Sequence, residues 1–386
     1  MKHFFRTGLT AFCLAALLSA CGNNAGWEEV EIAEQPVEDR RQTETLGERF
    51  GDACISEQTF EVELSEYDGK VWFVPYFSGG DGSDFHMQIV RGGESPQDME
   101  ILRDIQGENL GEYFSKDFES LDAVSFYDVN YDGETDILLL GKCGGREIAS
   151  VYYGYGPLYY GYDPADYDSA YFSYQETLSQ NISEKAPELT VCGIRAFLSE
   201  GKRNGEFSGY QEAYRAAVRL YEMEGREDMG YDLIYVDEDD IPELMAGVRG
   251  YWVSLYAFRD GKLYQPMAEW AYGAMGNAGY EYSPFQNSLR NYNADYAGAI
   301  RYTTYMALGP SCSIDTVGEI QVYAFDDVNG NGMPDEAEEG SLGKYSVTYF
   351  DGVEVPGDAE DPYDVGGYEY MDPSLDQDTI LSRLEG

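Results

Sequence analysis

Side chains that carry oxygen recur at alternate positions in one short stretch of the chain, DDVNGNGMPDEAEE, which covers residues 326–339. The stretch matches the spacing D-x-[DN]-x-[DN]-G-x5-E of a calcium-binding loop, in which alternate oxygens point inward and a late glutamate closes the shell. The predicted ligands are Asp327, Asn329, Asn331, the backbone carbonyl of Met333, Asp335 and Glu338, with Gly332 at the bend. A solvated acidic turn is the alternative interpretation.

The segment that leads into this loop indicates which kind of calcium loop it is. Residues 319–325, EIQVYAF, alternate apolar and polar side chains in the manner of a β-strand. An EF-hand requires a helix before its loop. The stretch therefore resembles an EF-hand in its loop only.

A second stretch, FYDVNYDGETDILLL, covers residues 126–140 and begins in the same way. Its twelfth position is Leu139, so a closing glutamate is missing, and the loop runs straight into an apolar strand. This form resembles the calcium loops of FG-GAP and VCBS-type repeats of extracellular proteins, although a propeller would need further copies. The predicted ligands are Asp128, Asn130, Asp132, the backbone carbonyl of Glu134, and Asp136.

Residues 235–247, YVDEDDIPELMAG, resemble a third and degenerate copy. Alignment with the other two stretches places Asp237, Asp239 and Glu243 at ligand positions. However, Tyr235 replaces the first ligand and Asp240 replaces the glycine. A plain bend between two strands is the alternative.

The N-terminus has the composition of an export signal. Lys2 and Arg6 precede an apolar run that is too short to span a bilayer, and this run ends in LSAC followed by glycine. LSAC resembles a bacterial lipobox, whose cysteine, here Cys21, is lipidated. We therefore expect a signal peptide over residues 1–21, a polar tether over 22–50 and a lipid anchor at the extracellular face of the cell membrane. An ordinary cleavage site is the alternative.

The charge balance limits the possible partners. Acidic residues outnumber basic residues by 72 to 25, which gives a formal net charge of −47. Such a surface repels nucleic acid and anionic lipid, and it also repels itself unless bound cations or counter-ions relieve the repulsion. With 43% hydrophobic and 15% aromatic residues, the chain can still bury substantial cores, which disfavours a disordered acidic tail.

Four cysteines remain after the signal and the lipid anchor are set aside: Cys54, Cys143, Cys192 and Cys312. An even number in an oxidising compartment predicts two disulfides. Of the three possible connectivities, we favour Cys54 with Cys143 and Cys192 with Cys312, because each pair would lie inside one predicted domain. Free thiols are the alternative, and the lack of C-x-x-C spacing disfavours zinc.

Strand patterns dominate the chain after residue 51. Alternation over residues 60–77, interrupted by Asp-Gly, predicts a β-hairpin, and YWVSLYAFRDGKLY at residues 251–264 repeats this pattern. Apolar residues at helical spacing predict an amphipathic helix over 208–224, with Ser208 and Gln211 as a capping box.

A polar segment at residues 181–189, which contains a proline, predicts a break between two domains. We expect a β-rich domain over residues 51–185 and an α+β domain over residues 190–386. The predicted fold class is α+β, predominantly antiparallel β.

Aromatic side chains gather in two places. Nine tyrosines fall within residues 151–174, where their ring faces could stack on sugars. Rings that pack on one another within a hairpin are the structural alternative, which we favour. Residues 270–296, rich in glycine, tyrosine and asparagine, are the first segment in which we expect a ligand.

Three stretches of the second domain resemble cell-surface lipoproteins of Gram-positive gut bacteria. They are YDLIYVDEDDIPELMAGVRGYWVSLY, YGAMGNAGYEYSPFQNSLRNYN and FDDVNGNGMPDEAEEG, which span roughly residues 192–370. No activity is assigned to that group. The resemblance therefore implies anchoring and a surface location, and it names no substrate.

The sequence offers no clear catalytic motif. His86 is the only histidine after the signal, no nucleophile elbow lies near it, and HExxH, Walker and phosphate-binding G-x-G-x-x-G patterns are missing. We expect a structural role for His86. Carboxylates for glycoside hydrolysis are too abundant for any pair to be singled out.

These observations favour a lipid-anchored, extracellular protein that binds Ca²⁺ and interacts with glycan, peptide or envelope components. A secreted hydrolase of polysaccharide or cell wall is the alternative.

Overall fold

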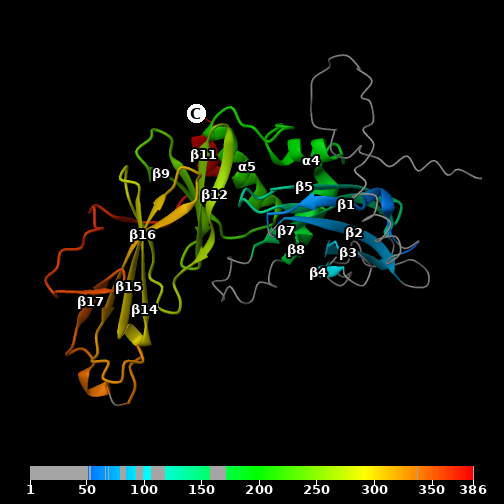
Figure 1. Cartoon of the computed structure of the whole chain (residues 1–386). Coiled ribbons are helices and arrows are strands. Elements are labelled where there is room, and N and C mark those ends of the chain that lie inside the picture. Colours follow the sequence, from blue (N-terminus) through cyan, green and yellow to red (C-terminus); the bar gives the residue numbers. More distant parts are fainter. Residues whose placement is uncertain are drawn as a thin grey trace, which may run out of the picture. The chain divides into compact units, whose positions relative to one another are not determined.

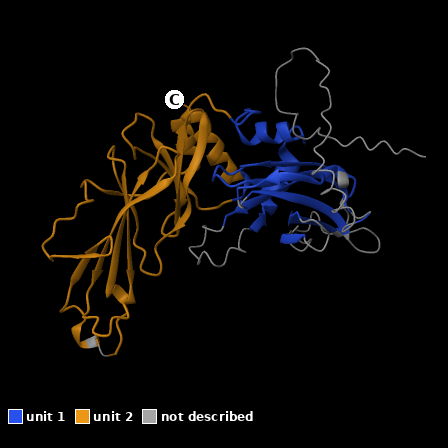
Figure 2. Cartoon of the chain, in the orientation of Figure 1, with its two compact units in different colours: residues 1–205, 223–225 blue, residues 206–222, 226–386 orange. Residues whose placement is uncertain are grey.

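The computed structural model (Figure 1) describes residues 51, 54–65, 67, 69–78, 84–92, 99–105, 118–156, 171–336 and 338–385. The predicted signal peptide, Cys21 and the tether lie outside these residues. The chain divides into two compact units (Figure 2): unit 1 is residues 1–205 and 223–225, and unit 2 is residues 206–222 and 226–386. Within the described ranges, no helix is long and apolar enough to cross a membrane.

Antiparallel sheets make up most of the regular structure in both units, which confirms the predicted α+β class with a predominance of antiparallel β. Unit 1 has two four-stranded sheets, with strand orders β1-β2-β3-β4 and β5-β6-β7-β8. Its elements are η2 (Ser56–Gln58), β1 (Phe60–Glu63), β2 (Lys70–Ser78), β3 (Asp84–Arg91), β4 (Glu100–Ile105), β5 (Phe118–Tyr127), β6 (Asp136–Cys143), β7 (Arg146–Tyr155), β8 (Tyr171–Tyr174), α3 (Glu176–Lys185) and α4 (Val191–Leu198).

Unit 2 has a four-stranded sheet, in the order β12-β11-β10-β9, and a seven-stranded sheet, in the order β18-β17-β16-β15-β14-β13-β19. Its elements are α5 (Tyr210–Met223), β9 (Gly230–Ile234), β10 (Glu243–Val248), β11 (Trp252–Arg259), β12 (Lys262–Ala271), β13 (Gly279–Ser283), β14 (Ser288–Asp295), η6 (Tyr296–Gly298), β15 (Ile300–Leu308), β16 (Ile314–Tyr323), η7 (Glu339–Ser341), β17 (Val347–Phe350), β18 (Val353–Val355), β19 (Glu369–Tyr370) and α6 (Gln377–Leu384).

The two sheets of unit 1 share one hydrophobic core. Phe73 and Ile89 of the first sheet belong to the same buried cluster as Ile137 and Tyr152 of the second. Phe126 of β5 meets the ring of Phe73 edge-on, with centroids 5.2 Å apart. The predicted hairpin over residues 60–77 is confirmed by the antiparallel pairing of β1 with β2.

Helix α3 supplies hydrogen-bond partners to one edge of the second sheet. Strand β8 pairs with β7 only from Tyr152 onward. For the preceding part of β7, two serines one helical turn apart act as acceptors: Ser179 Oγ accepts the Val151 N–H and Ser183 Oγ accepts the Ala149 N–H, each at 3.0 Å. Because a buried N–H without a partner is costly, these serines replace a longer β8.

The helix predicted over residues 208–224 is confirmed as α5, whose buried face packs on the four-stranded sheet of unit 2. Tyr214 Oη donates to the carbonyl of Pro242 at 2.6 Å, and Tyr256 Oη donates to Tyr221 Oη at 2.8 Å. The hydroxyl groups of this face are therefore satisfied within the core.

The N-terminal cap of α5 differs from the predicted one. The Ser208 N–H donates to the carboxylate of Glu212 at 2.9 Å, and Gln211 does not take this role. The reason is that the helix begins at Tyr210, which makes Glu212 its third residue.

The segment predicted as an inter-domain break, residues 181–189, is partly helical. Helix α3 extends to Lys185, and both α3 and α4 belong to unit 1. The bonds from Ser179 and Ser183 to β7 hold α3 in this unit. These contacts could not be predicted from the polar composition of the segment. The division between the units falls after residue 205, later than the predicted start of the second domain at residue 190.

No disulfide joins the four cysteines, all of which are described. Cys143 packs against the core between the two sheets of unit 1, whereas Cys54 packs on the opposite face of the first sheet. Cys192 belongs to unit 1 and Cys312 to unit 2. The second pair is therefore divided between the two compact units, and both disulfides stay predictions.

The described tyrosines of residues 151–174 pair with one another across a hairpin. Tyr155 stacks on Tyr171 with ring centroids 4.7 Å apart, and Tyr152 lies tilted against Tyr174 at 5.3 Å. These four rings agree with packing inside a hairpin. The remaining tyrosines of the run, apart from Tyr153, lie outside the described residues.

Replacing Ser179 with alanine should destabilise unit 1, because the buried Val151 N–H loses its acceptor. We expect the free energy of unfolding, measured by urea denaturation, to fall by about 1–3 kcal/mol. The exposed change Lys185→Ala on the same helix is the matched control and should stay within about 0.5 kcal/mol. Equal stability of Ser179→Ala and the unchanged protein would contradict this account of the β7 edge.

Candidate metal centre

Three loops of related sequence each follow a strand. The 128 loop (residues 128–136) joins β5 to β6, the 235 loop (residues 235–243) joins β9 to β10, and the 327 loop (residues 327–338) lies between β16 and η7. The element before the 327 loop is a strand, as predicted. The 128 loop also runs directly into a strand, since β6 begins at Asp136.

The first carboxylate of the 128 and 327 loops binds the backbone at the bend. Asp128 Oδ2 accepts the Gly133 N–H at 3.0 Å, and Asp327 Oδ2 accepts the Gly332 N–H at 2.9 Å. The two glycines have φ angles of 91° and 73°, which glycine adopts without strain. The glycine in the sequence pattern thus has the conformational role that a calcium loop requires.

The next two polar positions of these loops also make matching bonds. Asn130 Oδ1 accepts the Asp132 N–H at 3.3 Å, and Asp132 Oδ1 accepts the Glu134 N–H at 2.9 Å. In the 327 loop, Asn329 Oδ1 accepts the Asn331 N–H and Asn331 Oδ1 accepts the Met333 N–H, both at 2.9 Å. The two loops therefore share the same set of side-chain to backbone bonds.

A buried carboxylate closes each of the three loops by accepting the N–H of a valine. The bonds are 2.5 Å from Val129 to Asp136, 2.8 Å from Val236 to Glu243 and 2.9 Å from Val328 to Glu338. The three acidic residues are 0%, 3% and 1% exposed. All three loops share this closing bond.

The sequence pattern has Leu139 at the closing position of the 128 loop, but in the structure Asp136 is the closing carboxylate. The pattern aligned Asp136 with Asp335, whereas Asp136 makes the bond that Glu338 makes in the 327 loop. Asp136 is the first residue of β6. Its second carboxylate oxygen, Oδ1, accepts the Gly154 N–H of β7 at 2.9 Å. Asp335 instead accepts from the side-chain amide of Asn329 at 2.6 Å.

Burial and mutual repulsion disfavour ionisation of the carboxyl groups in the 128 loop. Burial, with a smaller effect of Asp132, raises the pKa of Asp128 to about 7, and burial raises the pKa of Asp132 to about 6. Burial and the charges of Asp132 and Asp128 raise the pKa of Asp136 well above its usual value. In the described part of the chain, no lysine or arginine forms an ion pair with these three residues. Among the described residues, backbone N–H groups offset this negative charge in part, and no positively charged side chain pairs with it.

Calcium suits both donor sets because it accepts about six to eight oxygen ligands in flexible geometry. In the structure, the amide NH₂ of Asn130 donates to Asp132 at 2.8 Å, as that of Asn329 does to Asp335. Among the described residues, no three Asp, Glu, His or Cys side chains form a preformed metal site. An incoming ion must therefore displace these amide contacts and rotate the asparagine oxygens towards itself.

The 235 loop keeps the closing bond and the two middle bonds, the second of which runs from the Ile241 N–H to Asp239 at 2.7 Å, but it lacks the first carboxylate and the bend glycine. Asp237 Oδ1 accepts the Asp239 N–H at 3.0 Å, as the matching residues of the other loops do. Tyr235, at the first ligand position, stacks its ring on Phe285 with centroids 4.7 Å apart. Burial raises the pKa of Glu243 to about 8. This loop therefore lacks the first calcium ligand.

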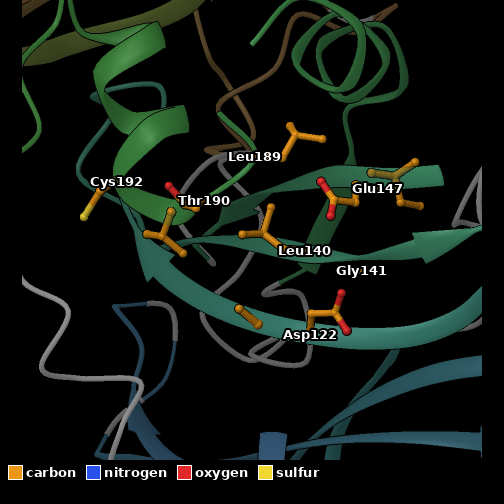
Figure 3. Close-up of a pocket in the computed structure, with 10 residues that line it drawn as sticks. Asp122, Leu140, Gly141, Glu147, Leu189, Thr190 and Cys192 are labelled. Carbon is orange, nitrogen blue, oxygen red and sulfur yellow. The ribbon is translucent and has the colours of Figure 1, made fainter. Parts of the chain in front are cut away.

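A pocket of about 410 Å³ lies in unit 1 between the second sheet and the start of α4 (Figure 3). Leu140 and Val191 give it an apolar wall, and Asp122 and Glu147 contribute carboxylates near Gly141. Both acidic residues are exposed. The lining of the pocket therefore offers no buried carboxylate.

His86 and Trp270, both considered for a functional role from the sequence, pack against neighbouring aromatic rings. His86 stacks on Tyr76 across the first sheet, with ring centroids 5.1 Å apart. Trp270 packs on Tyr280 at 5.5 Å beside the core of unit 2. The rings of this part of residues 270–296 thus contribute to packing.

No model of a known protein family matches this chain, and no curated protein matches it. A functional assignment therefore depends on the chemistry of the loops. The resemblance of the second domain to surface lipoproteins stays a prediction.

In a calcium chelator, the free energy of unfolding should fall as the pH rises from about 4 to about 7. The pKa values of Asp128 and Asp132 in the folded protein, about 7 and about 6, exceed the usual 3.8. In this window the folded protein binds more protons than the unfolded chain does, so raising the pH removes stability. Urea unfolding at several pH values measures the slope.

The change Asp132→Asn should flatten that slope and increase stability in chelator above pH 7 by about 1 kcal/mol. Asn331 of the 327 loop shows that an asparagine can accept the same backbone N–H. Asp122→Asn, which removes an exposed carboxylate of the same unit, is the control and should leave the slope unchanged. Identical slopes for Asp132→Asn and the unchanged protein would contradict the repulsion described for the 128 loop.

Proposed function

We propose that this protein is a lipid-anchored, extracellular calcium-binding surface protein. In this proposal the 128 loop and the 327 loop each hold one Ca²⁺. The export signal and the LSAC stretch ending in Cys21 support the anchor and the location. A calcium-rich exterior would keep both loops loaded.

The buried carboxylates of the 128 loop, with which no described lysine or arginine forms an ion pair, are the observation that carries this proposal. Asp136 is fully buried, and Asp128 and Asp132 lie within the same short loop. Burying charges without a counter-charge is costly, so such a group normally has a cation or takes up protons. A divalent cation would supply the charge and bind the same oxygens. Asn130 and the Glu134 carbonyl would complete the shell.

The 327 loop supports the same conclusion with a fuller set of ligands. Its side chains accept backbone N–H groups in the same order as those of the 128 loop, and Glu338 adds a buried closing carboxylate. The proposed ligands are Asp327, Asn329, Asn331, the Met333 carbonyl, Asp335 and Glu338.

The proposed role of the ions is structural. Asp136 is both the closing residue of the 128 loop and the first residue of β6. The carbonyl of Glu338 accepts from the N–H and hydroxyl of Ser341, at 2.8 and 2.7 Å, and so fixes the turn after the 327 loop. Each ion would therefore stabilise the connection that follows its loop.

Exposed aromatic rings of unit 2 support a role in binding a partner. Tyr251, Phe285 and Tyr235 are 70%, 45% and 37% exposed. Such rings can stack on the C–H faces of sugars or pack on a protein. A glycan array tests this part of the proposal: binding without turnover supports a binding module, whereas release of reducing sugar would favour the hydrolase alternative.

Calorimetric titration of a soluble form that begins after Cys21 tests the calcium proposal. We expect two bound ions for the unchanged protein, and one each for Asp128→Ala and Asp327→Ala. Because calcium binds the folded state, saturation should raise the melting temperature. At one hundred times the dissociation constant, each site should add about 2.7 kcal/mol to the free energy of unfolding.

The change Asp122→Ala removes an acidic side chain outside the loops and is the control. It should bind two ions, like the unchanged protein. Absence of heat and of any thermal shift at millimolar calcium would overturn the proposal, and the loops would then be solvated acidic turns.

A further inference from the structure

Arg259, the last residue of β11, contacts the 235 loop. Its guanidinium lies 3.1 Å from the carboxylate of Asp237. It also donates to the carbonyls of Pro310 at 2.8 Å and Gly309 at 3.2 Å. The side chains of Arg259 and Asp237 are 31% and 13% exposed, so the pair is better shielded than most surface ion pairs.

Asp237 occupies the position of Asn130 and Asn329 in the other two loops. Each of the three follows a valine whose N–H binds the closing carboxylate, and each accepts the N–H two residues further on. This is the third position of the loop pattern, where a calcium loop presents a ligand. In the 235 loop a guanidinium contacts that ligand position.

Two positions of the 235 loop differ from the calcium-loop pattern, while Asp239 still accepts the N–H two residues further on. Tyr235 replaces the first carboxylate and turns its ring onto Phe285. Asp240 replaces the bend glycine, and it is not among the residues with positive φ. The two ends of the loop are still joined by the bond from Val236 to Glu243.

We propose that Arg259 is the built-in counter-ion of the 235 loop. Its guanidinium supplies the positive charge that calcium supplies in the 128 and 327 loops, and this comparison rests on the proposed function. The loop between β9 and β10 then closes without a metal. Arg259 also ties this loop to the turn at Gly309 and Pro310, between β15 and β16. Removal of calcium should therefore leave this part of unit 2 folded.

Calcium titration and thermal melting of Arg259 variants test the inference. Arg259→Met keeps an apolar stem but removes the charge. We expect it to melt at a lower temperature in chelator, and millimolar calcium should restore part of the loss. A double variant with Tyr235→Asp regains the first ligand, so it should bind one ion more than the unchanged protein and hold that ion about tenfold more tightly than Arg259→Met alone. Arg259→Lys keeps the charge and should gain no ion.

The matched control is Arg249→Met. Arg249 pairs with Asp372 at 2.7 Å, but its side chain is 76% exposed, so its loss should change neither the melting temperature nor the number of bound ions. An equal loss of stability for Arg259→Met in calcium and in chelator, with no extra ion in the double variant, would overturn the inference. Arg259 would then only tie the carbonyls of Gly309 and Pro310.

The same titrations separate this inference from the calcium proposal. If the unchanged protein binds two ions and the Arg259 variants bind no more, the inference fails alone. If the unchanged protein binds none and the double variant binds one, the calcium proposal for the other loops fails, and only the role of Arg259 as counter-ion of the 235 loop stands.

Discussion

A buried carboxylate that accepts the backbone N–H of a valine seven or ten residues earlier is the interaction on which the three loops depend. The bond joins the two ends of each loop and fixes where the next element begins. It also brings a negative charge into a region with little water, where an isolated charge is costly. Such a carboxylate needs a cation, a proton or further hydrogen bonds to offset that cost.

Three effects can offset this negative charge: protonation, a bound calcium ion and a neighbouring arginine. Protonation is the simplest, and the raised pKa values of Asp128, Asp132 and Glu243 show its direction. In our account calcium supplies the positive charge in the 128 and 327 loops, and Arg259 supplies it to Asp237 in the 235 loop. With a formal net charge of −47, the protein gains more from bound cations than a neutral protein would. An exported location would make calcium available.

The strand-rich class, helix α5, and the 128 and 327 loops could be predicted from the sequence. Alternation, helical spacing and the D-x-N spacing at the start of these loops are local signals. The sequence did not predict that Asp136 closes the 128 loop, since that role depends on where β6 begins. The serines of α3 and the contact of Arg259 with Asp237 depend on tertiary structure in the same way. The polar composition of residues 181–189 predicted a domain break. Part of that polarity comes from Ser183, whose hydroxyl accepts a backbone N–H of β7.

The most direct test is a crystal structure of the protein grown in calcium, with anomalous difference density used to locate the ions. We expect one peak in the 128 loop and one in the 327 loop, each within about 2.3–2.6 Å of its oxygen ligands. We expect no peak in the 235 loop, where the guanidinium of Arg259 should contact Asp237. Loops without peaks at millimolar calcium, with Asn130 and Asn329 still donating to the neighbouring carboxylates, would contradict the account.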